Sequence, residues 1–136
     1  MSFATAAALQ AALYTRLASD PAVSALVGAG IHDAVPPGTP PGTFVVVGTG
    51  ETLDRSCVTT SAAEHRVRIA VISNAAGFQA AKEAAAAVCD ALLAQPAPNL
   101  PRGRIVGVWF ARAEASRMRA TGARRVEMTF RVLVED

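Results

Sequence analysis

The two histidines, His32 and His65, are the residues of this chain best suited to acid–base chemistry. His32 precedes Asp33, an order that resembles a general base followed by the carboxylate that orients it. Adjacent residues on an extended segment point in opposite directions, however, and the sequence positions no nucleophilic residue to act with this pair. His65 follows Glu64 at the predicted start of a strand, where a polar strand end is the simpler interpretation. The histidines therefore predict no catalytic site.

Phosphate, calcium and base-binding motifs are equally incomplete. Gly48-Thr49-Gly50 resembles a fragment of a phosphate loop, but the third glycine, the lysine and the following helix are missing. The acidic residues do not repeat at the spacing of a calcium loop. Trp109 and Phe110, beside Arg112, resemble a platform for stacking bases, yet the chain has few aromatic residues and its core needs most of them. An enzymatic interpretation has almost no residues to support it.

Arginine dominates the basic residues, with twelve copies against a single lysine, Lys82. One explanation is a genome rich in GC; the other is that guanidinium groups make paired hydrogen bonds to carboxylates or phosphates at interfaces. A formal net charge of +2 is too small to indicate nucleic-acid binding by bulk electrostatics. Cys57 and Cys89 form no CxxC motif, so we expect two reduced thiols and no metal or other cofactor.

The elements that would position these residues fit one domain over 1–136. No segment is long and apolar enough to predict a transmembrane helix, so we expect no membrane partner. The first residues lack the positive start of a signal peptide, so we expect a protein made in a bacterial cytoplasm.

Two long helices are predicted, over residues 3–18 and from Ser73 or Asn74 to about residue 94. In the first, leucines recur every four residues; in the second, apolar residues recur at spacings of three and four. Asp20-Pro21 predicts a capped short helical turn between the first helix and the strands. Ser73 or Asn74 is expected to cap the second long helix.

Four strands are predicted, over residues 44–48, 64–72, 104–116 and 124–134. The last has the clearest pattern, because its apolar residues fall on one face: Val126, Met128, Phe130, Val132 and Val134. Residues 33–43 hold four prolines and two glycines and predict an irregular connection. Residues 49–63 are small and polar and predict a long loop, either functional or flexible. The strand over 104–116 is partly apolar on both faces, which favours an inner strand or one with a partner across its far face.

Together these elements predict an α+β fold, with a mainly antiparallel four-stranded sheet and both long helices packed on one face. The other face is expected to carry charged residues, either in solvent or against a partner. They are Arg66, Arg68, Arg125, Glu127 and Arg131.

In the order and spacing of its elements, the chain resembles the tail-completion, or tail-terminator, proteins of long-tailed phages and phage-like gene transfer agents. The likeness runs over nearly the whole length. It is carried by residues 8–17 with Asp20-Pro21, by 31–38, by 44–48, by 64–73 with the alanine-rich helix that follows, and by 126–132.

The resemblance implies a structural protein, not an enzyme, with no catalytic motif. Such proteins form a ring, usually of six copies, at the head-proximal end of the tail tube. The ring stops tube growth and joins the tail to a connector, adaptor or stopper protein, while DNA passes through its lumen. We expect the chain to be incorporated into the neck or tail of such a particle. Residues at the interfaces or in a lumen loop are expected to be Thr52, Asp54, Arg55, Arg66, Arg68, Arg125 and Arg131.

Two alternatives stay open. A head-completion, or neck, protein also forms rings, and binding to tail tube protein or to portal protein would separate the two. A small ligand-binding or enzymatic α+β domain is the alternative of another class. A stable dimer carrying a metabolite would favour that class, whereas a monomer that converts to rings would favour the particle protein.

Overall fold

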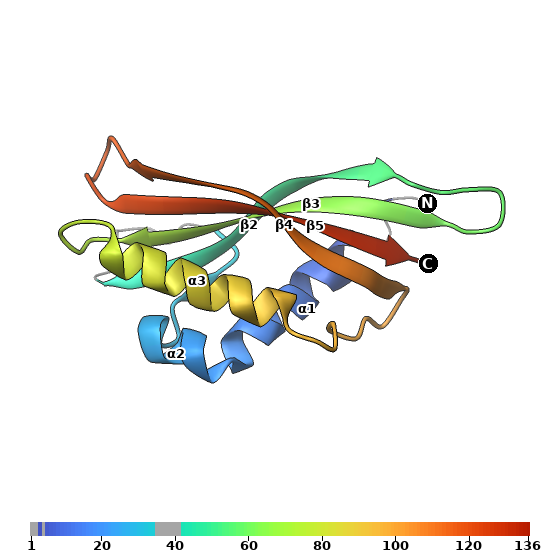
Figure 1. The fold of residues 1–136 in the computed structure, drawn as a ribbon, viewed down its shortest axis with the longest axis horizontal. Coiled ribbons are helices and arrows are strands. Elements are labelled where there is room, and N and C mark those ends of the chain that lie inside the picture. The colour runs from blue at the N-terminus through green and yellow to red at the C-terminus, as the bar shows by residue number, and fades with distance from the viewer. Residues whose placement is uncertain (1–2, 4, 35–41) are drawn as a thin grey trace.

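The computed structural model of the chain describes residue 3, residues 5–34 and residues 42–136. Over these residues the chain forms three helices and five strands (Figure 1). In chain order they are α1 (Ala6–Ser19), α2 (Pro21–Val27), β1 (Ile31–His32), β2 (Thr43–Asp54), β3 (Ala62–Ser73), α3 (Gln79–Leu93), β4 (Arg104–Arg117) and β5 (Arg124–Glu135). The proline-rich connection predicted over 33–43 lies mostly outside the described residues.

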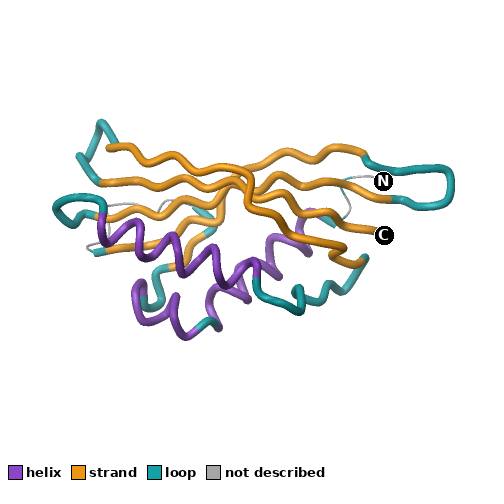
Figure 2. Tube along the Cα trace, in the orientation of Figure 1, coloured by secondary structure: helices purple, strands orange, loops and turns teal. Residues whose placement is uncertain are grey.

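The strands of the described chain form one five-stranded sheet in the order β1-β2-β3-β5-β4. β1 runs parallel to β2, and each of the other neighbouring pairs is antiparallel. The helices lie against one side of the sheet, as Figures 1 and 2 show. We call this side the covered face and the opposite side the open face. The α+β class and the one-sided helices are confirmed, but the expected four strands were one too few.

The additional strand, β1, is only two residues long and pairs with Val45 and Val46. The Val45 amide also donates to the Gly30 carbonyl at 2.7 Å. A two-residue strand has no periodicity of its own, which is why the sequence pattern did not indicate it.

The helices cover the sheet through the apolar positions that their spacing predicted. Leu9, Leu13 and Leu17 of α1 are buried, and α3 buries small residues together with Val88 and Leu92. Alanines let α3 lie close to the sheet. Asp20 caps α2 as expected, with its carboxylate accepting hydrogen bonds from the amides of residues 22 and 23. In the described residues no helix is long and apolar enough to cross a membrane.

The expected cap of the second long helix was wrong. α3 begins at Gln79, and no side chain caps its N-terminus. Ser73 instead ends β3, where its hydroxyl accepts a hydrogen bond from the Thr43 hydroxyl at 2.9 Å. Asn74 accepts a hydrogen bond from the Gly42 amide at 3.0 Å. Both polar side chains are therefore used to close the start of β2 against the end of β3.

The long loop expected over 49–63 was also wrong, because most of it is strand. β2 continues to Asp54 and pairs with β3 down to Asp54 opposite Ala63, so that residues 55–61 alone form the turn. A bulge between Val47 and Gly50 shifts the register. A Cβ atom at Gly50 would lie 2.1 Å from the Arg66 carbonyl oxygen, so the close approach of the two strands requires glycine there. Because the segment is polar, its composition did not indicate that β2 continues through it. This second half of β2 lies at the edge of the described sheet.

The last two strands form a second long hairpin. The predicted alternation in β5 is confirmed, since Val126, Met128, Phe130, Val132 and Val134 are all buried on the covered face. Of the two positions that its apolar composition favoured, β4 does not take the inner one, because β5 lies between β3 and β4 and β4 forms the edge. A partner across its far face stays a prediction. Beyond Val108, every residue of β4 is exposed.

A smaller apolar cluster lies on the open face, near one end of the sheet. It consists of Phe44, Val46, Ala70, Ile72 and Ala123, with Met118 packed against it. The main core lies between the sheet and the helices. The open face is therefore apolar at one end and carries charged residues farther along the strands.

Candidate functional site

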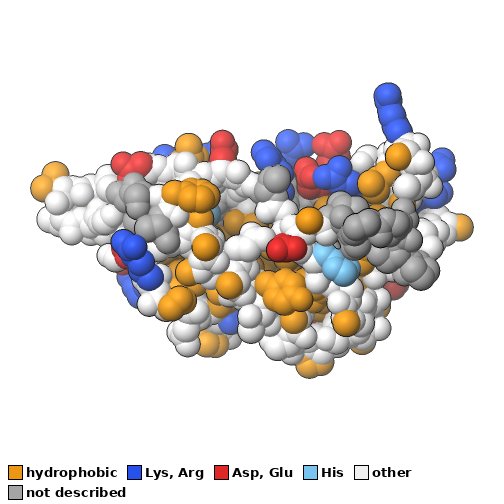
Figure 3. All heavy atoms as spheres, turned by 180° about the vertical axis from the view of Figure 1, so that it is seen from behind, with side chains coloured by type: hydrophobic (Ala, Val, Ile, Leu, Met, Phe, Trp, Pro, Cys, Tyr) orange, Lys and Arg blue, Asp and Glu red, His pale blue; other side chains and the backbone are white. Residues whose placement is uncertain are grey.

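The open face carries a row of side chains across four strands. Glu51 of β2, Arg66 of β3, Arg131 of β5 and Trp109 of β4 stand opposite one another in the strand registers. In Figure 3 the charged side chains gather along the upper side of the molecule, over the sheet. We call these four residues the cross-strand row.

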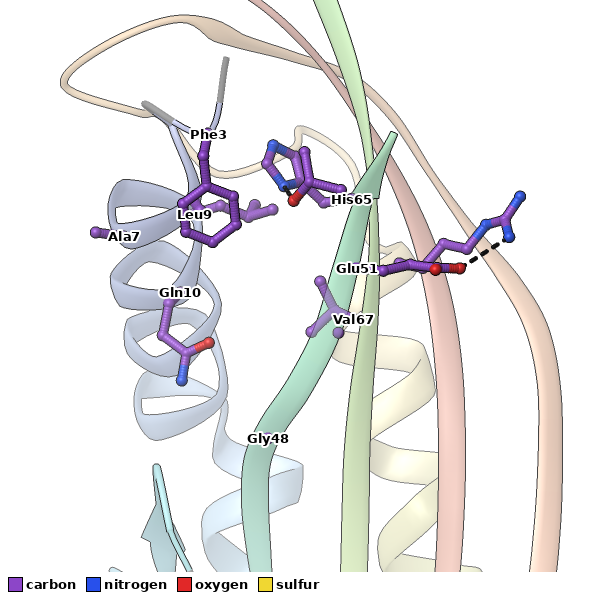
Figure 4. A pocket seen from close by; sticks show the side chains of 12 residues that line it. Phe3, Ala7, Leu9, Gln10, Gly48, Glu51, His65 and Val67 are labelled. Carbon is purple, nitrogen blue, oxygen red and sulfur yellow. Dashed lines mark hydrogen bonds and ion pairs between the residues drawn. The ribbon is translucent and has the colours of Figure 1, made fainter. Parts of the chain in front are cut away.

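Arg66 is the best connected residue of the row. Its Nε donates to Glu64 Oε2 at 2.9 Å. Its Nη1 donates to Glu51 Oε1 at 3.0 Å, the contact drawn as a dashed line beside Glu51 in Figure 4. The hydrogen bond to Glu64, followed in size by that to Glu51, raises the pKa of Arg66 above its ordinary value. At the other end of the row, the Arg131 guanidinium lies 5.5 Å from the centre of the Trp109 ring, within the range of a cation–π contact. The row is thus held in place by contacts within the chain.

Further charged residues continue this surface. Arg125 pairs with Glu127, and Arg112 Nη2 donates to Glu114 Oε2 at 3.2 Å. Arg68 has no ion-pair partner among the described residues, and it stands opposite Thr129 between the cross-strand row and the apolar end. Exposed ion pairs of this kind contribute about 0–1 kcal/mol to stability. Their main effect is on how positive and negative charges are distributed over the open face.

The residues expected at interfaces do not all come together. Arg66, Arg68, Arg125 and Arg131 share the open face, as predicted from their alternation. Arg55 begins the β2–β3 turn, with its Nε 3.8 Å from Glu64 Oε1.

The other two members of that predicted set lie elsewhere. Asp54 ends β2, and its carboxylate accepts a hydrogen bond from the Ser56 amide at 3.0 Å. The hydrogen bonds from Ser56 lower the pKa of Asp54. Thr52 points to the covered face, where its hydroxyl lies 3.0 Å from His65 Nδ1.

His65 is buried, which differs from the polar strand end that its position suggested. Its Nε2 lies 3.2 Å from the hydroxyl of Thr5, the residue preceding α1. Burial lowers the pKa of His65, which favours the neutral ring. A neutral imidazole between two threonine hydroxyls ties the start of α1 to the β2–β3 hairpin. His32, by contrast, packs edge-on against Phe44, with ring centres 5.9 Å apart.

The two edges of the sheet were not identified from the sequence. On the β4 edge, Trp109 and Phe110 are 43% and 46% exposed, and Val106 is similarly accessible. Beside β2, a pocket of about 340 Å³ opens between that strand and α1 (Figure 4). Its apolar walls come from Phe3, Ala6, Ala7 and Leu9. Trp109 and Phe110, whose likeness to a stacking platform the sequence composition disfavours, point to opposite faces of the sheet.

The turns of the two long hairpins project from opposite ends of the sheet (Figure 1). The β2–β3 turn exposes Val58 completely and Cys57 beside it. At the β4–β5 turn, Arg117 ends β4 and Arg119 lies in the turn, and both are exposed. Among the described residues, no group of three histidine, cysteine or acidic side chains is placed to hold a metal ion.

The chain matches a known protein family and chains of solved structures. The family model described as "Tail completion protein gp17" matches residues 11–135. A chain of a solved structure entitled "Virion of native gene transfer agent (GTA) particle" is 48% identical, with a TM-score of 0.90. The match covers 99% of this chain and 100% of that chain. A comparison with curated protein sequences gives no significant match.

Proposed function

This chain belongs to the tail completion protein gp17 family, and from that premise we propose that its copies form a ring at the head-proximal end of a phage-like tail tube. The ring ends tube growth and joins the tail to the head or neck. The full-length likeness to a chain of a gene transfer agent virion is the observation that carries the proposal.

The shape of the subunit supports a ring. A cyclic ring needs two different contact surfaces on each copy, one for each neighbour. Among the described residues, the sheet offers two edges without a strand neighbour, β4 and the second half of β2, and they differ in character. The open face and the two projecting turns stay available for the proteins above and below the ring. One subunit can therefore serve both its own copies and other partners.

The residues proposed for outside contacts fall into two groups. Arg66, Arg68, Arg125 and Arg131 present the charged open face, and Arg55 with Asp54 begins the β2–β3 turn. We assign the turn to contact with the tail tube protein or the lumen, where DNA passes without sequence-specific binding. Thr52 contributes to the shape of that hairpin through His65.

The proposal is tested by removing this chain from cells that make the particle. We expect tails of irregular length and heads without attached tails, counted by negative-stain electron microscopy. Complementation with the natural chain should restore uniform, attached tails. Intact DNA-delivering particles that lack this subunit would refute the proposal.

The contribution of the β2–β3 turn has its own test. Replacing residues 56–61 by Asn-Gly keeps the pairing of Asp54 with Ala63 and closes the hairpin with a tight turn. The variant should fold, judged by circular dichroism, but should fail to complete tails. Pull-down with tail tube protein, or with portal or adaptor protein, identifies the partner lost. Capture of portal or adaptor protein alone would favour a neck ring instead.

A further inference from the structure

We propose that copies of this chain join edge to edge in the ring, with β4 of one copy extending the sheet of the next along β2. Phe110 of the first copy enters the pocket between α1 and β2 of the second. The inference rests on the ring proposed above and identifies the surfaces that hold it together.

The β4 edge is suited to pairing with another chain. β4 has 14 residues and no neighbour on its outer side among the described residues. Beyond Val108 it is exposed on both faces, and its aromatic rings at Trp109 and Phe110 are nearly half accessible. Long, exposed edges with apolar side chains invite pairing with other chains, and soluble proteins normally blunt them. This edge therefore has the properties of a surface that assembly covers.

The β2 edge provides the complementary surface. β1 pairs with Val45 and Val46, and Gln10 Nε2 donates to the Val47 carbonyl at 3.0 Å. Within the described chain, residues 50–54 pair with β3 alone, so their outer side is open. The pocket lies beside this stretch, on the covered face, as Figure 4 shows.

The strand directions and faces allow a continuous sheet. β2 and β5 run in one direction and β3 and β4 in the other, so β2 of the next copy runs antiparallel to β4. Rotation about an axis along the strands keeps the covered faces of all copies on the same side. Phe110 is on the covered face opposite Phe130, which is the side where the pocket opens.

Charge and side-chain direction select a register. We place Arg112 of β4 opposite Glu51 of the next copy, since both lie on the open face at the two edges. The bulge between Phe110 and Arg112 then sets Phe110 opposite Thr52 and Trp109 opposite Leu53. Thr52 lines the pocket, and Trp109 and Leu53 form an apolar pair on the open face. One register thus matches a charge pair, an apolar pair and a ring with its pocket.

A second copy is the occupant that these observations favour. The side chain of Arg112 is 70% exposed and that of Glu51 is 52% exposed, so both charges are accessible to a partner on another copy. The contact joins two different surfaces, so it repeats head to tail and gives a ring where the rotation closes. The tube end serves as the template that selects closure over open filaments.

Exchange of the two charges is the first test, in cells that make the particle and lack the natural gene. Arg112→Glu or Glu51→Arg alone should lower the number of completed particles at least about tenfold, because like charges then meet at every interface. The double variant should restore them to within about threefold, because the pair is reversed. The unfolding temperature of each isolated variant should stay near that of the parent, since both side chains are exposed. Single variants with normal particles, or a double variant without rescue, would overturn the pairing.

A disulfide across the interface is the second test. Leu53→Cys with Trp109→Cys, in a Cys57→Ser background, should give a ladder of linked subunits from oxidised particles on non-reducing gels. Within one chain β3 and β5 separate these positions by about 14 Å, beyond the reach of a disulfide. The control pair, Leu53→Cys with Ser116→Cys, has an exposed partner farther along β4 and should remain unlinked.

The outcomes separate this inference from the ring itself. Complete particles without a ladder, or a ladder from the control pair alone, would overturn the proposed edge contact and leave the ring standing. Normal particles in cells without the chain would overturn the ring and the edge contact together. If the cysteine pair prevents incorporation, the charge exchange decides.

Discussion

Phe130 and Arg131 are neighbours in the chain, yet they belong to surfaces with different roles. Phe130 is 1% exposed and packs within the main core on the covered face. Arg131 lies on the open face, against the Trp109 ring and opposite Arg66. The covered face carries the main apolar core beneath the helices, whereas much of the open face is charged. The folding free energy is therefore concentrated on one side, and the other side is available for assembly.

The physical basis of this division is the difference between burial and exposed ion pairs. Burying a large apolar side chain contributes about 1.5–3 kcal/mol, whereas an exposed ion pair contributes about 0–1 kcal/mol. The five buried residues of β5 thus stabilise the fold far more than Arg66, Arg125 and Arg131 together. Substitutions on the two faces should separate folding from assembly.

The largest effect is expected for Phe130→Asp. It places a carboxylate without a partner in the main core, at a cost of several kcal/mol. We expect the variant to fail to fold, measured as the loss of a cooperative transition in urea followed by circular dichroism. A folded Phe130→Asp protein would show that the covered face tolerates charge and would remove the distinction between the faces.

A smaller but clear loss is expected for Gly50→Ala, at the bulge where β2 meets the pocket. The added Cβ would lie 2.1 Å from the Arg66 carbonyl oxygen, so the two strands must move apart, at about 1–3 kcal/mol. Gly48→Ala is the matched control, because its Cβ would lie 3.4 Å from the Arg68 carbonyl oxygen. Urea unfolding should give a lower free energy of unfolding for Gly50→Ala than for Gly48→Ala. Equal values would contradict the strand pairing at the bulge.

His65 predicts a pH dependence on the covered face. Burial lowers its pKa in the folded state, so the unfolded chain binds more protons once the pH falls below about 6.5. The stability contributed by the neutral ring is complete above the unfolded-state pKa and is lost as the pH falls toward the folded-state pKa. The free energy of unfolding should therefore decrease below pH 6.5, by at most about 1.4 kcal/mol per pH unit for one proton.

His65→Gln keeps an amide that can bond to the threonine hydroxyls but removes this titration. The slope between pH 6.5 and pH 5 should be shallower in the variant, measured by urea unfolding at each pH. An unchanged slope would assign the pH dependence to other groups.

The smallest effect on stability is expected for Arg131→Glu. The change removes a cation–π contact but also relieves the like charge opposite Arg66, so we expect a difference within about 0.5 kcal/mol. The unfolding midpoint in urea is the measurement. If Arg131→Glu unfolds the protein while Phe130→Asp does not, the register of β5 is wrong by one residue.

Features were predictable from the sequence where the pattern that encodes them lies within a single helix or strand. The leucines of α1 and the alternation in β5 were predicted correctly, because a single helix or strand contains the whole signal. Of the residues expected at interfaces, four arginines share the open face, but Thr52 points to the other side; their contact with partners stays a prediction. The second half of β2 was not predicted, because its residues are small and polar and the strand signal is weak where neither face is fully apolar.

The limit of prediction from the sequence is clearest at the edges of the sheet. The residues of β4 are more apolar than an edge strand normally allows, so their composition favoured an inner position. Only the pairing of β5 with both β3 and β4 places Trp109 and Phe110 at the edge, and only the packing of α1 beside β2 forms the pocket.

The amino-acid sequence alone established which elements are amphipathic, which side of each is buried and that the helices share one face of a sheet. These properties depend on periodicity, which neighbouring residues impose locally. The tertiary structure decided which strands pair, how long each hairpin is and which edges stay open. Those features depend on contacts between residues distant in the chain, such as His65 with Thr5, and no local pattern encodes them.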